Sequence, residues 1–516
     1  MRVALLTAAL LLTRRVGAPA ALRRVAVTTA GPVEGVVDAH GARWLNVPFA
    51  APPVGELRFA PPQAPTPWTA VRDCTGSEQA WCPQLVSLLG KLVVGEEDCL
   101  YANVYAPPAA SASLPVVVFL HGGAYVAGDD KEGGLYDGSR LAANASAVVI
   151  TANYRLGALG FLTHPSLLSA DGAANFGLQD QRHLLRWVHD NAAAFGGDAS
   201  RVTLMGQSAG AMMVCAHLAS PTTNAFFHAA IMESGNCDSA LLWSPLPAAL
   251  QHGLDFAAAH GCDDQSAACL RSLPLAQLMM VQQQDSAPLA PLLPWVPVVD
   301  GNPAGVPELP LAALSRTPVP VIVGTVKDEG TMFAVLSAAL LTDTPRLDAA
   351  QLRDLLLRVY NGSSVSAMLE RYPDGTATAR LAAIVRDALF VCPARRTAAA
   401  IFAGGGRAYM YHFDYVLRWP EARLGLGTYH ASELPFVFRN HGGVHTFNGA
   451  DKRVEVRERT AALQHGCGTL GGWFVSDAPG LSMAGAVLTA LGSICSQRRP
   501  VGGRASCVAA VRRQQR

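Results

Sequence analysis

One segment of the chain constrains its fold more than any other. An apolar, β-branched run at Val202 to Met205 stops at the pentapeptide Gly206-Gln207-Ser208-Ala209-Gly210, and a helix-compatible segment, Ala211 to Leu218, follows at once. This G-x-S-x-G pattern predicts a strand, a sharp turn and a helix, with the Ser208 hydroxyl held clear of the strand end. The two outer glycines let the strand and the helix approach closely.

A second apolar run lies upstream, at Pro115 to Leu120, and ends in His121-Gly122-Gly123-Ala124. A glycine pair after a strand lets backbone N–H groups turn toward a substrate carbonyl, and a serine nucleophile needs such donors for the developing oxyanion. The alternative is that His121 to Ala124 form an ordinary turn at a strand end, with no role in catalysis. Because a lone G-x-S-x-G arises by chance in long glycine-rich chains, the prediction of an acyl-transfer site rests on both segments together.

Composition excludes several classes of protein. Of the 516 residues, 50% are apolar and 15% are charged, with a formal net charge of +1, so a disordered chain and an electrostatic nucleic-acid binder are disfavoured. Strand-like runs alternate with helix-like ones, which predicts an α/β fold with a mostly parallel central sheet covered by helices on both faces. The strand-like runs are Val116 to Leu120, Ala147 to Asn153, Arg201 to Met205, His228 to Met232, Val319 to Gly324 and Ala408 to Tyr415.

The two ends of the chain differ from the rest. Arg2, the apolar stretch Val3 to Leu12 and the small residues Ala18-Pro19-Ala20 predict a secretory signal peptide over residues 1–20. No later apolar stretch is long enough to span a membrane. We expect a single domain over residues 21–480 and a diverged or disordered basic tail over residues 481–516, which is rich in arginine.

The cysteine count fits a secreted protein. Eleven cysteines imply disulfides and leave at least one thiol unpaired, whereas a cytosolic protein would keep them as buried free thiols. Two local pairs are expected, Cys82 with Cys99 and Cys262 with Cys269. Two sequons are candidate glycosylation sites in the same compartment, at Asn144-Ala145-Ser146 and Asn361-Gly362-Ser363.

Acyl transfer at Ser208 also needs a base and an acid that orients the base. In hydrolases with this turn, the chain order is serine, acid, histidine. Asp328 and Glu329 follow the apolar run that begins at Val321, and His430 lies in a later loop. Spacing alone selects neither Glu329 over Asp328 nor His430 among the fourteen histidines.

Further segments resemble the type-B carboxylesterases of the cholinesterase family, over roughly Gly31 to Phe438. The resemblance implies an α/β-hydrolase fold and an ester-hydrolysing enzyme without metal or cofactor. His121, which could be mistaken for a metal ligand, is then part of the oxyanion loop. The segments that carry the resemblance, besides the Ser208 turn, are Asn46 to Phe59 within Gly35 to Pro62, Glu97 to Val104, Asn175 to Gln181, Trp187 to Asn191 and Phe195 to Asp198.

The resemblance also implies residue roles. Ser208 is expected as the nucleophile, Glu329 as the triad acid and His430 as the base, with an oxyanion hole formed by the N–H groups of Gly123, Ala124 and Ala209. Structural ion pairs are expected between Arg58 and Glu97 and between Arg155 and Asp180. Ser234 either hydrogen-bonds near the acid or only packs. Cys392 resembles half of a disulfide whose other half is Cys467, Cys495 or Cys507.

The chain departs from the family pattern at two positions that bear on the substrate. Gln207 stands where the family usually has a glutamate, and Met332 stands in the place of an aromatic residue, so two groups that would favour a cationic substrate are absent. We therefore expect a secreted serine carboxylesterase whose partner is a small, uncharged and fairly apolar ester. Lipase and thioesterase activities are close variants.

A protein of another class fits the same fold. A cholinesterase-like adhesion or binding protein would present the fold to a partner and lose catalysis. Such relatives usually lack a triad member, whereas Ser208, Glu329 and His430 are all present in this chain.

Overall fold

The computed structural model of the chain describes residues 22–76, 80–86, 92–108, 113–168, 174–238, 242–280, 295–303, 305–342, 344–416 and 425–440. The expected signal peptide and basic tail lie outside the described residues. Within the described part, none of the helices is long and apolar enough to cross a membrane.

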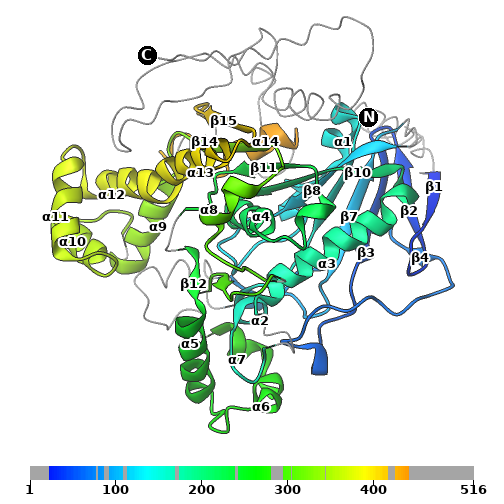
Figure 1. The fold of residues 1–516 in the computed structure, drawn as a ribbon, viewed down its shortest axis with the longest axis horizontal. Helices are drawn as coiled ribbons and strands as arrows, with labels where there is room; N and C mark the ends of the chain where they lie inside the picture. Colours follow the sequence, from blue (N-terminus) through cyan, green and yellow to red (C-terminus); the bar gives the residue numbers. More distant parts are fainter. Residues whose placement is uncertain are drawn as a thin grey trace, which may run out of the picture.

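A large twisted sheet organises the described residues (Figure 1). Along the main strand order, the first four pairs of neighbouring strands are antiparallel and the following five pairs are parallel. The order across the sheet is β1 (Leu22–Val27), β2 (Pro32–Asp38), β3 (Gly41–Pro48), β7 (Tyr101–Ala106), β9 (Val148–Ala152), β8 (Leu114–Leu120), β10 (Gly197–Gln207), β11 (Ala229–Glu233), β14 (Val321–Val326) and β15 (Ala408–Phe413), with β4 (Arg72–Asp73) paired to β2.

The parallel part confirms the strand runs expected from the sequence, because each of the six runs overlaps one of these strands. The antiparallel part was not expected. Its outermost strand, β1, is mostly exposed and has no regular alternation, and β2 alternates between half-buried and buried positions only over its first five residues. Two further pairs lie outside the main sheet, β5 (Gln84–Val86) with β6 (Leu92–Val94) and β12 (Ser244–Pro245) with β13 (Val298–Val299).

The central strands are buried on both faces, as their continuous apolar runs predict. On β8, Val116, Val118 and Leu120 belong to one hydrophobic core, whereas Val117 and Phe119 belong to another. Because side chains alternate along a strand, the two cores lie on opposite faces of the sheet.

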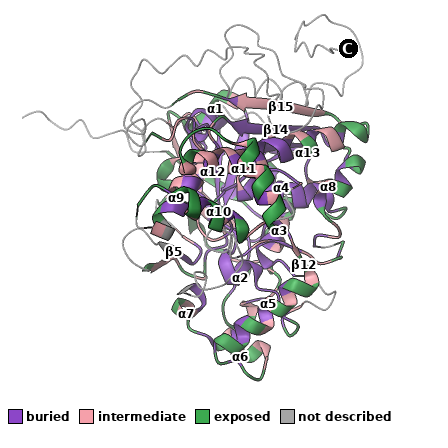
Figure 2. Ribbon diagram, turned by 90° about the vertical axis from the view of Figure 1, so that its left-hand side faces the viewer, coloured by how far each residue is buried: buried purple, intermediate pink, exposed green. Residues whose placement is uncertain are grey.

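Helices cover both faces, which confirms the expected architecture. On one face lie α3 (Phe176–Asn191) and α4 (Ala209–Ala219), and α4 packs on β8, β10 and β11. On the other face lie α1 (Ser139–Ala145) and α14 (Leu434–Val437). The burial colouring in Figure 2 shows α4 as buried, whereas α5 and α6 at the lower end carry exposed faces.

Two groups of helices extend beyond the sheet in Figure 1. One group has a small hydrophobic core of its own and consists of α9 (Thr331–Thr342), α10 (Ala349–Leu357), α11 (Gly362–Arg371) and α12 (Ala377–Val385). The other consists of α5 (Leu246–Ala259), α6 (Ala267–Ser272) and α7 (Leu275–Met280). Shorter or connecting helices are α2 (Gly157–Phe161), α8 (Pro310–Ala313), the π-helix η8 (Arg386–Val391) and α13 (Cys392–Ala403).

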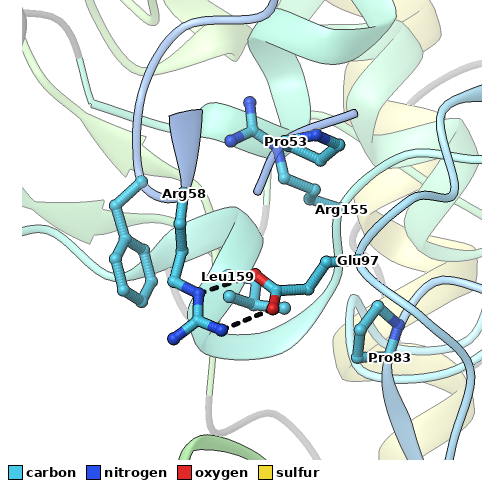
Figure 3. Close-up of a pocket in the computed structure, with 7 residues that line it drawn as sticks. Pro53, Arg58, Pro83, Glu97, Arg155 and Leu159 are labelled. Atoms are coloured by element: carbon cyan, nitrogen blue, oxygen red, sulfur yellow. Dashed lines mark hydrogen bonds and ion pairs between the residues drawn. The ribbon is translucent and has the colours of Figure 1, made fainter. Parts of the chain in front are cut away.

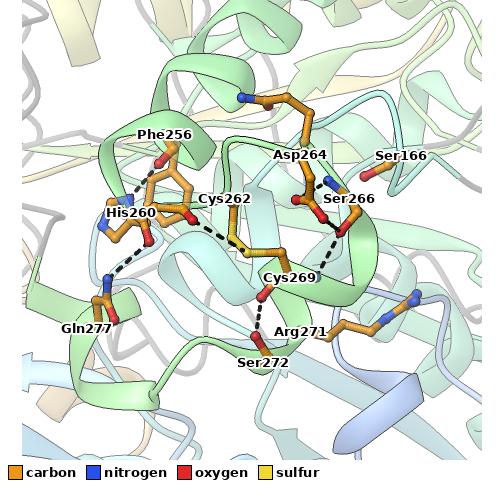
Figure 4. The surroundings of a disulfide bond; sticks show 12 residues. Ser166, Phe256, His260, Cys262, Asp264, Ser266, Cys269, Arg271, Ser272 and Gln277 are labelled. Carbon is orange, nitrogen blue, oxygen red and sulfur yellow. Dashed lines mark hydrogen bonds between the residues drawn. A yellow bond between two sulfur atoms is a disulfide. The ribbon is translucent and has the colours of Figure 1, made fainter.

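Disulfides join segments around the sheet. The structure contains Cys82–Cys99 and Cys262–Cys269, and the second closes the loop before α6 (Figure 4). A third bond, Cys215–Cys237, was not expected; it links α4 to the loop after β11. Cys392 is also disulfide-bonded, and its three candidate partners lie outside the described residues.

Both expected ion pairs are present. Arg155 donates from Nε and Nη2 to the two Asp180 oxygens at 2.8 and 2.7 Å, and both side chains are almost fully buried. Arg58 forms a two-point contact with Glu97 beside a small pocket (Figure 3). Arg58 also donates to the carbonyl oxygens of Arg271 and Leu273, so it links the end of α6 to the segment before β7 that carries Glu97. The lining of this pocket contains none of the expected catalytic residues.

The buried ion pair gives a stability prediction. Asp180→Asn leaves the Arg155 charge buried without its counter-ion, so we expect the free energy of unfolding to fall by about 3–5 kcal/mol. Urea unfolding measures the change. Asp198→Asn is the control, because its pair with Arg201 is partly exposed and is worth about 1 kcal/mol or less. Equal losses in the two variants would contradict the prediction.

Candidate active site

Ser208 stands at the sharp turn between β10 and α4. Its backbone has φ 55° and ψ −124°, a conformation that L-residues rarely adopt, and its N–H donates to the Glu233 carbonyl oxygen at 2.9 Å. A Cβ on Gly210 would lie 2.0 Å from the Leu120 carbonyl oxygen, so α4 can start this close to β8 only with glycine there. The strand, turn and helix expected from G-x-S-x-G are therefore all present.

The loop after β8 lies against this turn. A Cβ on Gly122 would come within 2.9 Å of Ser208 Cβ, and one on Gly123 would lie 2.0 Å from the Ala127 carbonyl oxygen. Gly123 and the next residue, Ala124, both have positive φ, 111° and 55°. Successive residues in such conformations turn their N–H groups out of the strand direction. Ala209 begins α4, where helix geometry leaves N–H groups without partners inside the helix.

His430 is held by Glu329. The ring Nδ1 lies 2.6 Å from Glu329 Oε2, and the two side chains are 4% and 0% exposed. The other carboxylate oxygen, Oε1, accepts the backbone N–H of Val326 at 3.0 Å, so the carboxylate is fixed from two sides. This geometry is that of a carboxylate orienting an imidazole base.

The two carboxylates that follow β14 have separate tasks. Asp328 Oδ2 accepts the Thr428 N–H at 2.8 Å, and Asp328 N–H donates to the Thr428 carbonyl oxygen at 2.9 Å. Asp328 also forms a parallel bridge with Tyr429, the residue before His430. Asp328 therefore anchors the loop that carries His430, while Glu329 contacts the imidazole. Sequence spacing alone could not decide which of the two carboxylates does so.

The second ring nitrogen of His430 faces the Ser208 turn. His430 Nε2 lies 3.3 Å from the side-chain nitrogen of Gln207, the residue immediately before Ser208. Aromatic rings flank the imidazole: the ring centroids of Phe333 on α9 and Phe390 on η8 lie 5.0 and 4.8 Å from that of His430. Phe390 carries no sequence motif, and only the folded chain reveals its contact.

Two further carboxyl groups are buried near the triad candidates. Ser234 donates its hydroxyl to Glu433 Oε1 at 3.3 Å, so Ser234 does hydrogen-bond beside the site. Burial, together with the charge of Glu329, raises the pKa of Glu433 to about 8. Burial and the nearby Glu433 also raise the pKa of Glu233 well above its usual range. Glu433 was not expected at the site. The one sequence feature that could have indicated it is its position three residues after His430.

The remaining expected site residues lie at separate places. His121 is buried in the loop after β8, its Nδ1 lies 2.8 Å from the Gly122 carbonyl oxygen, and its ring stacks on Tyr154. Asn144 is exposed on α1, and Asn361 is exposed at the start of α11, where its side chain accepts the Ser364 N–H. Both sequons are therefore on the surface.

The assembled groups suit acyl transfer. The loop with turned backbone amides follows β8, and the strained serine follows β10. The carboxylate follows β14, and the buried imidazole that it orients lies in the loop beyond β15. Ligand sites of open α/β sheets form at the carboxyl ends of the strands. The described residues contain no cluster of three or more side chains able to hold a metal ion.

Comparisons with known proteins agree with this chemistry. The sequence model described as "Carboxylesterase family" matches residues 22–461. The chain is 33% identical to a para-nitrobenzyl esterase of Bacillus subtilis (strain 168), over 86% of this chain and 88% of that protein. It is 36% identical to an acylcarnitine hydrolase of Mus musculus, over 77% and 73%. A solved structure named PNB esterase matches with a TM-score of 0.69 and 33% identity, over 82% of this chain and 87% of that one.

The raised pKa of Glu433 predicts how stability depends on pH. The folded protein holds this proton more tightly than the unfolded chain, so the stabilising contribution is complete below the unfolded pKa and is lost as pH rises through about 8. The slope is at most about 1.4 kcal/mol per pH unit for one group.

Glu433→Gln removes the titration, so we expect its free energy of unfolding to fall less steeply than that of the wild type between pH 5 and 8. Urea unfolding across this range checks the slope. Parallel curves for the two proteins would show that Glu433 does not titrate there.

Proposed function

Because the chain belongs to the carboxylesterase family and is a carboxylic-ester hydrolase, we propose that Ser208, His430 and Glu329 form its catalytic triad. The observation that carries the proposal is the 2.6 Å contact between His430 Nδ1 and Glu329 beside the Ser208 turn. Nδ1 carries the proton in this contact, so Nε2 holds the lone pair that can accept one. A base in that form can activate a serine hydroxyl.

The proposed reaction has two halves. Ser208 attacks the ester carbonyl while His430 Nε2 takes the hydroxyl proton, and the imidazolium then gives that proton to the departing alcohol. Water attacks the acyl-enzyme by the same route and releases the acid. In this proposal the hydrogen bond from the Ser208 hydroxyl to His430 Nε2 forms when substrate binds, because catalytic hydrogen bonds are commonly long or poorly aligned in the free enzyme.

The oxyanion hole is proposed to consist of the N–H groups of Gly123, Ala124 and Ala209. Positive φ at the first two and the helix start at the third support this role. Such donors act in a site from which water is largely excluded, where each contributes about 3 kcal/mol to transition-state stabilisation.

The proposed substrates are small, uncharged and fairly apolar esters. Gln207 is neutral, and the rings of Phe333 and Phe390 border the base with apolar surface. Of the two named relatives, one is called a para-nitrobenzyl esterase, after a neutral group, and the other an acylcarnitine hydrolase, after a group that carries a quaternary ammonium. The neutral Gln207 favours the first kind of substrate for this chain.

We also propose that the protein is secreted and glycosylated. Three disulfides among the described residues and a fourth at Cys392 are compatible with an oxidising compartment, and Asn144 and Asn361 are exposed. The signal peptide proposed for residues 1–20 is consistent with this route.

Ser208→Ala tests the triad proposal. We expect wild-type protein to be labelled once per chain by a fluorophosphonate and to hydrolyse a nitrophenyl ester, and the variant to lose the label and about 10⁴-fold or more in kcat. Mass spectrometry of the labelled peptide identifies the residue. The control is Ser200→Ala, because Ser200 is exposed on the same strand and should leave labelling intact. Folded wild-type protein that resists labelling would instead support a non-catalytic binding protein.

A matched pair of esters tests the substrate class. Butyrylcholine and 3,3-dimethylbutyl butyrate have the same shape, and only the first carries a positive charge. Since Gln207 supplies no negative charge, we expect kcat/KM to be higher for the neutral ester. A strong preference for the choline ester would contradict the proposed substrate class.

A further inference from the structure

We propose that Gln207 is a positioning residue whose side-chain amide holds His430 as a neutral, proton-accepting base. This inference rests on the proposed triad. Gln207 is the last residue of β10, directly before Ser208, and is 3% exposed. Its side chain therefore reaches the imidazole from the strand that carries the nucleophile.

The Gln207 amide is held between two parts of the site. Its Nε2 lies 3.3 Å from His430 Nε2. Its Oε1 packs against the oxyanion loop, because a Cβ on Gly122 would lie 2.6 Å from that oxygen. The amide therefore lies between the imidazole and Gly122.

The polarity of the contact follows from the Glu329 side of the ring. With Nδ1 2.6 Å from the carboxylate, the ring proton resides on Nδ1, so Nε2 of the neutral imidazole can only accept a hydrogen bond. An amide NH₂ donates to such an acceptor and stabilises the neutral ring. A protonated ring has no acceptor to offer, and the amide would have to turn its oxygen toward it. The Gln207 contact therefore favours the neutral form of His430 in the free protein, and the amide gives up the Nε2 lone pair to the Ser208 hydroxyl when substrate binds.

The surrounding charges explain why a neutral donor suits this position. The titratable groups near the His430–Glu329 pair are Glu433 just before α14, Glu233 at the end of β11, and Tyr411 and His412 on β15. From α9 and η8, Phe333 and Phe390 contact the ring. Three of these groups are fully buried carboxyls. An amide at position 207 supplies a hydrogen bond without adding a fourth.

Two variants separate hydrogen bonding from charge. Gln207→Met keeps an uncharged side chain of similar length and removes the donor, and Gln207→Glu replaces the donor with a group that stabilises the imidazolium. The readout is kcat/KM for a neutral nitrophenyl ester against pH, with active sites counted by fluorophosphonate labelling. We expect the acidic limb to move to higher pH by about one unit or more in Gln207→Glu, and by less in Gln207→Met.

A matched control is available in the protein interior. Gln181 on α3 is also buried, and its Oε1 lies 3.1 Å from Nε2 of His217, so Gln181→Glu makes the same replacement in a second Gln–His pair away from the site. Its acidic limb, normalised to labelled sites, should match that of the wild type. An unmoved limb in Gln207→Met would overturn the inference, even if Gln207→Glu fails to fold. Wild-type protein that takes no label at Ser208 would overturn the proposed triad instead.

Discussion

The close approach of β8, β10 and the start of α4 is the constraint on which the rest of the site depends. Glycine at position 210 permits it, because any side chain there would collide with the backbone at Leu120. The turn this creates forces Ser208 into a conformation that costs about 1–3 kcal/mol, and the buried sheet on both faces supplies the stability to hold it. Strain is thus concentrated at the proposed reacting group.

Parallel strands then bring distant segments together. Because parallel strands carry their following loops to one edge, the loops after β8, β10 and β14 meet there, and Asp328 fixes the later loop that carries His430. Burial sets the charge state of the carboxyl groups at this edge. Glu329 is fully enclosed, while Glu233 and Glu433 respond to burial with raised pKa values, so negative charge close to the base is limited.

Local sequence pattern predicts only part of this structure. The turn at Ser208 and the parallel strands follow from periodicity and glycine spacing, and both ion pairs follow from the family resemblance. It could not separate Glu329 from Asp328, since both follow the same strand and only the fold decides which one meets the ring. It also missed Cys215–Cys237 and the contact of Phe390 with His430, because neither leaves a periodic signal. The mostly exposed strand β1 was missed because its burial does not alternate.

The most direct measurement is a crystal structure of the protein after reaction with a fluorophosphonate. The account predicts a covalent bond from phosphorus to Ser208 Oγ. It also predicts a phosphoryl oxygen within hydrogen-bond distance of the Gly123, Ala124 and Ala209 N–H groups, with His430 Nε2 facing the adduct. A phosphoryl oxygen directed away from these amides, or an imidazole no longer bonded to Glu329, would contradict the account.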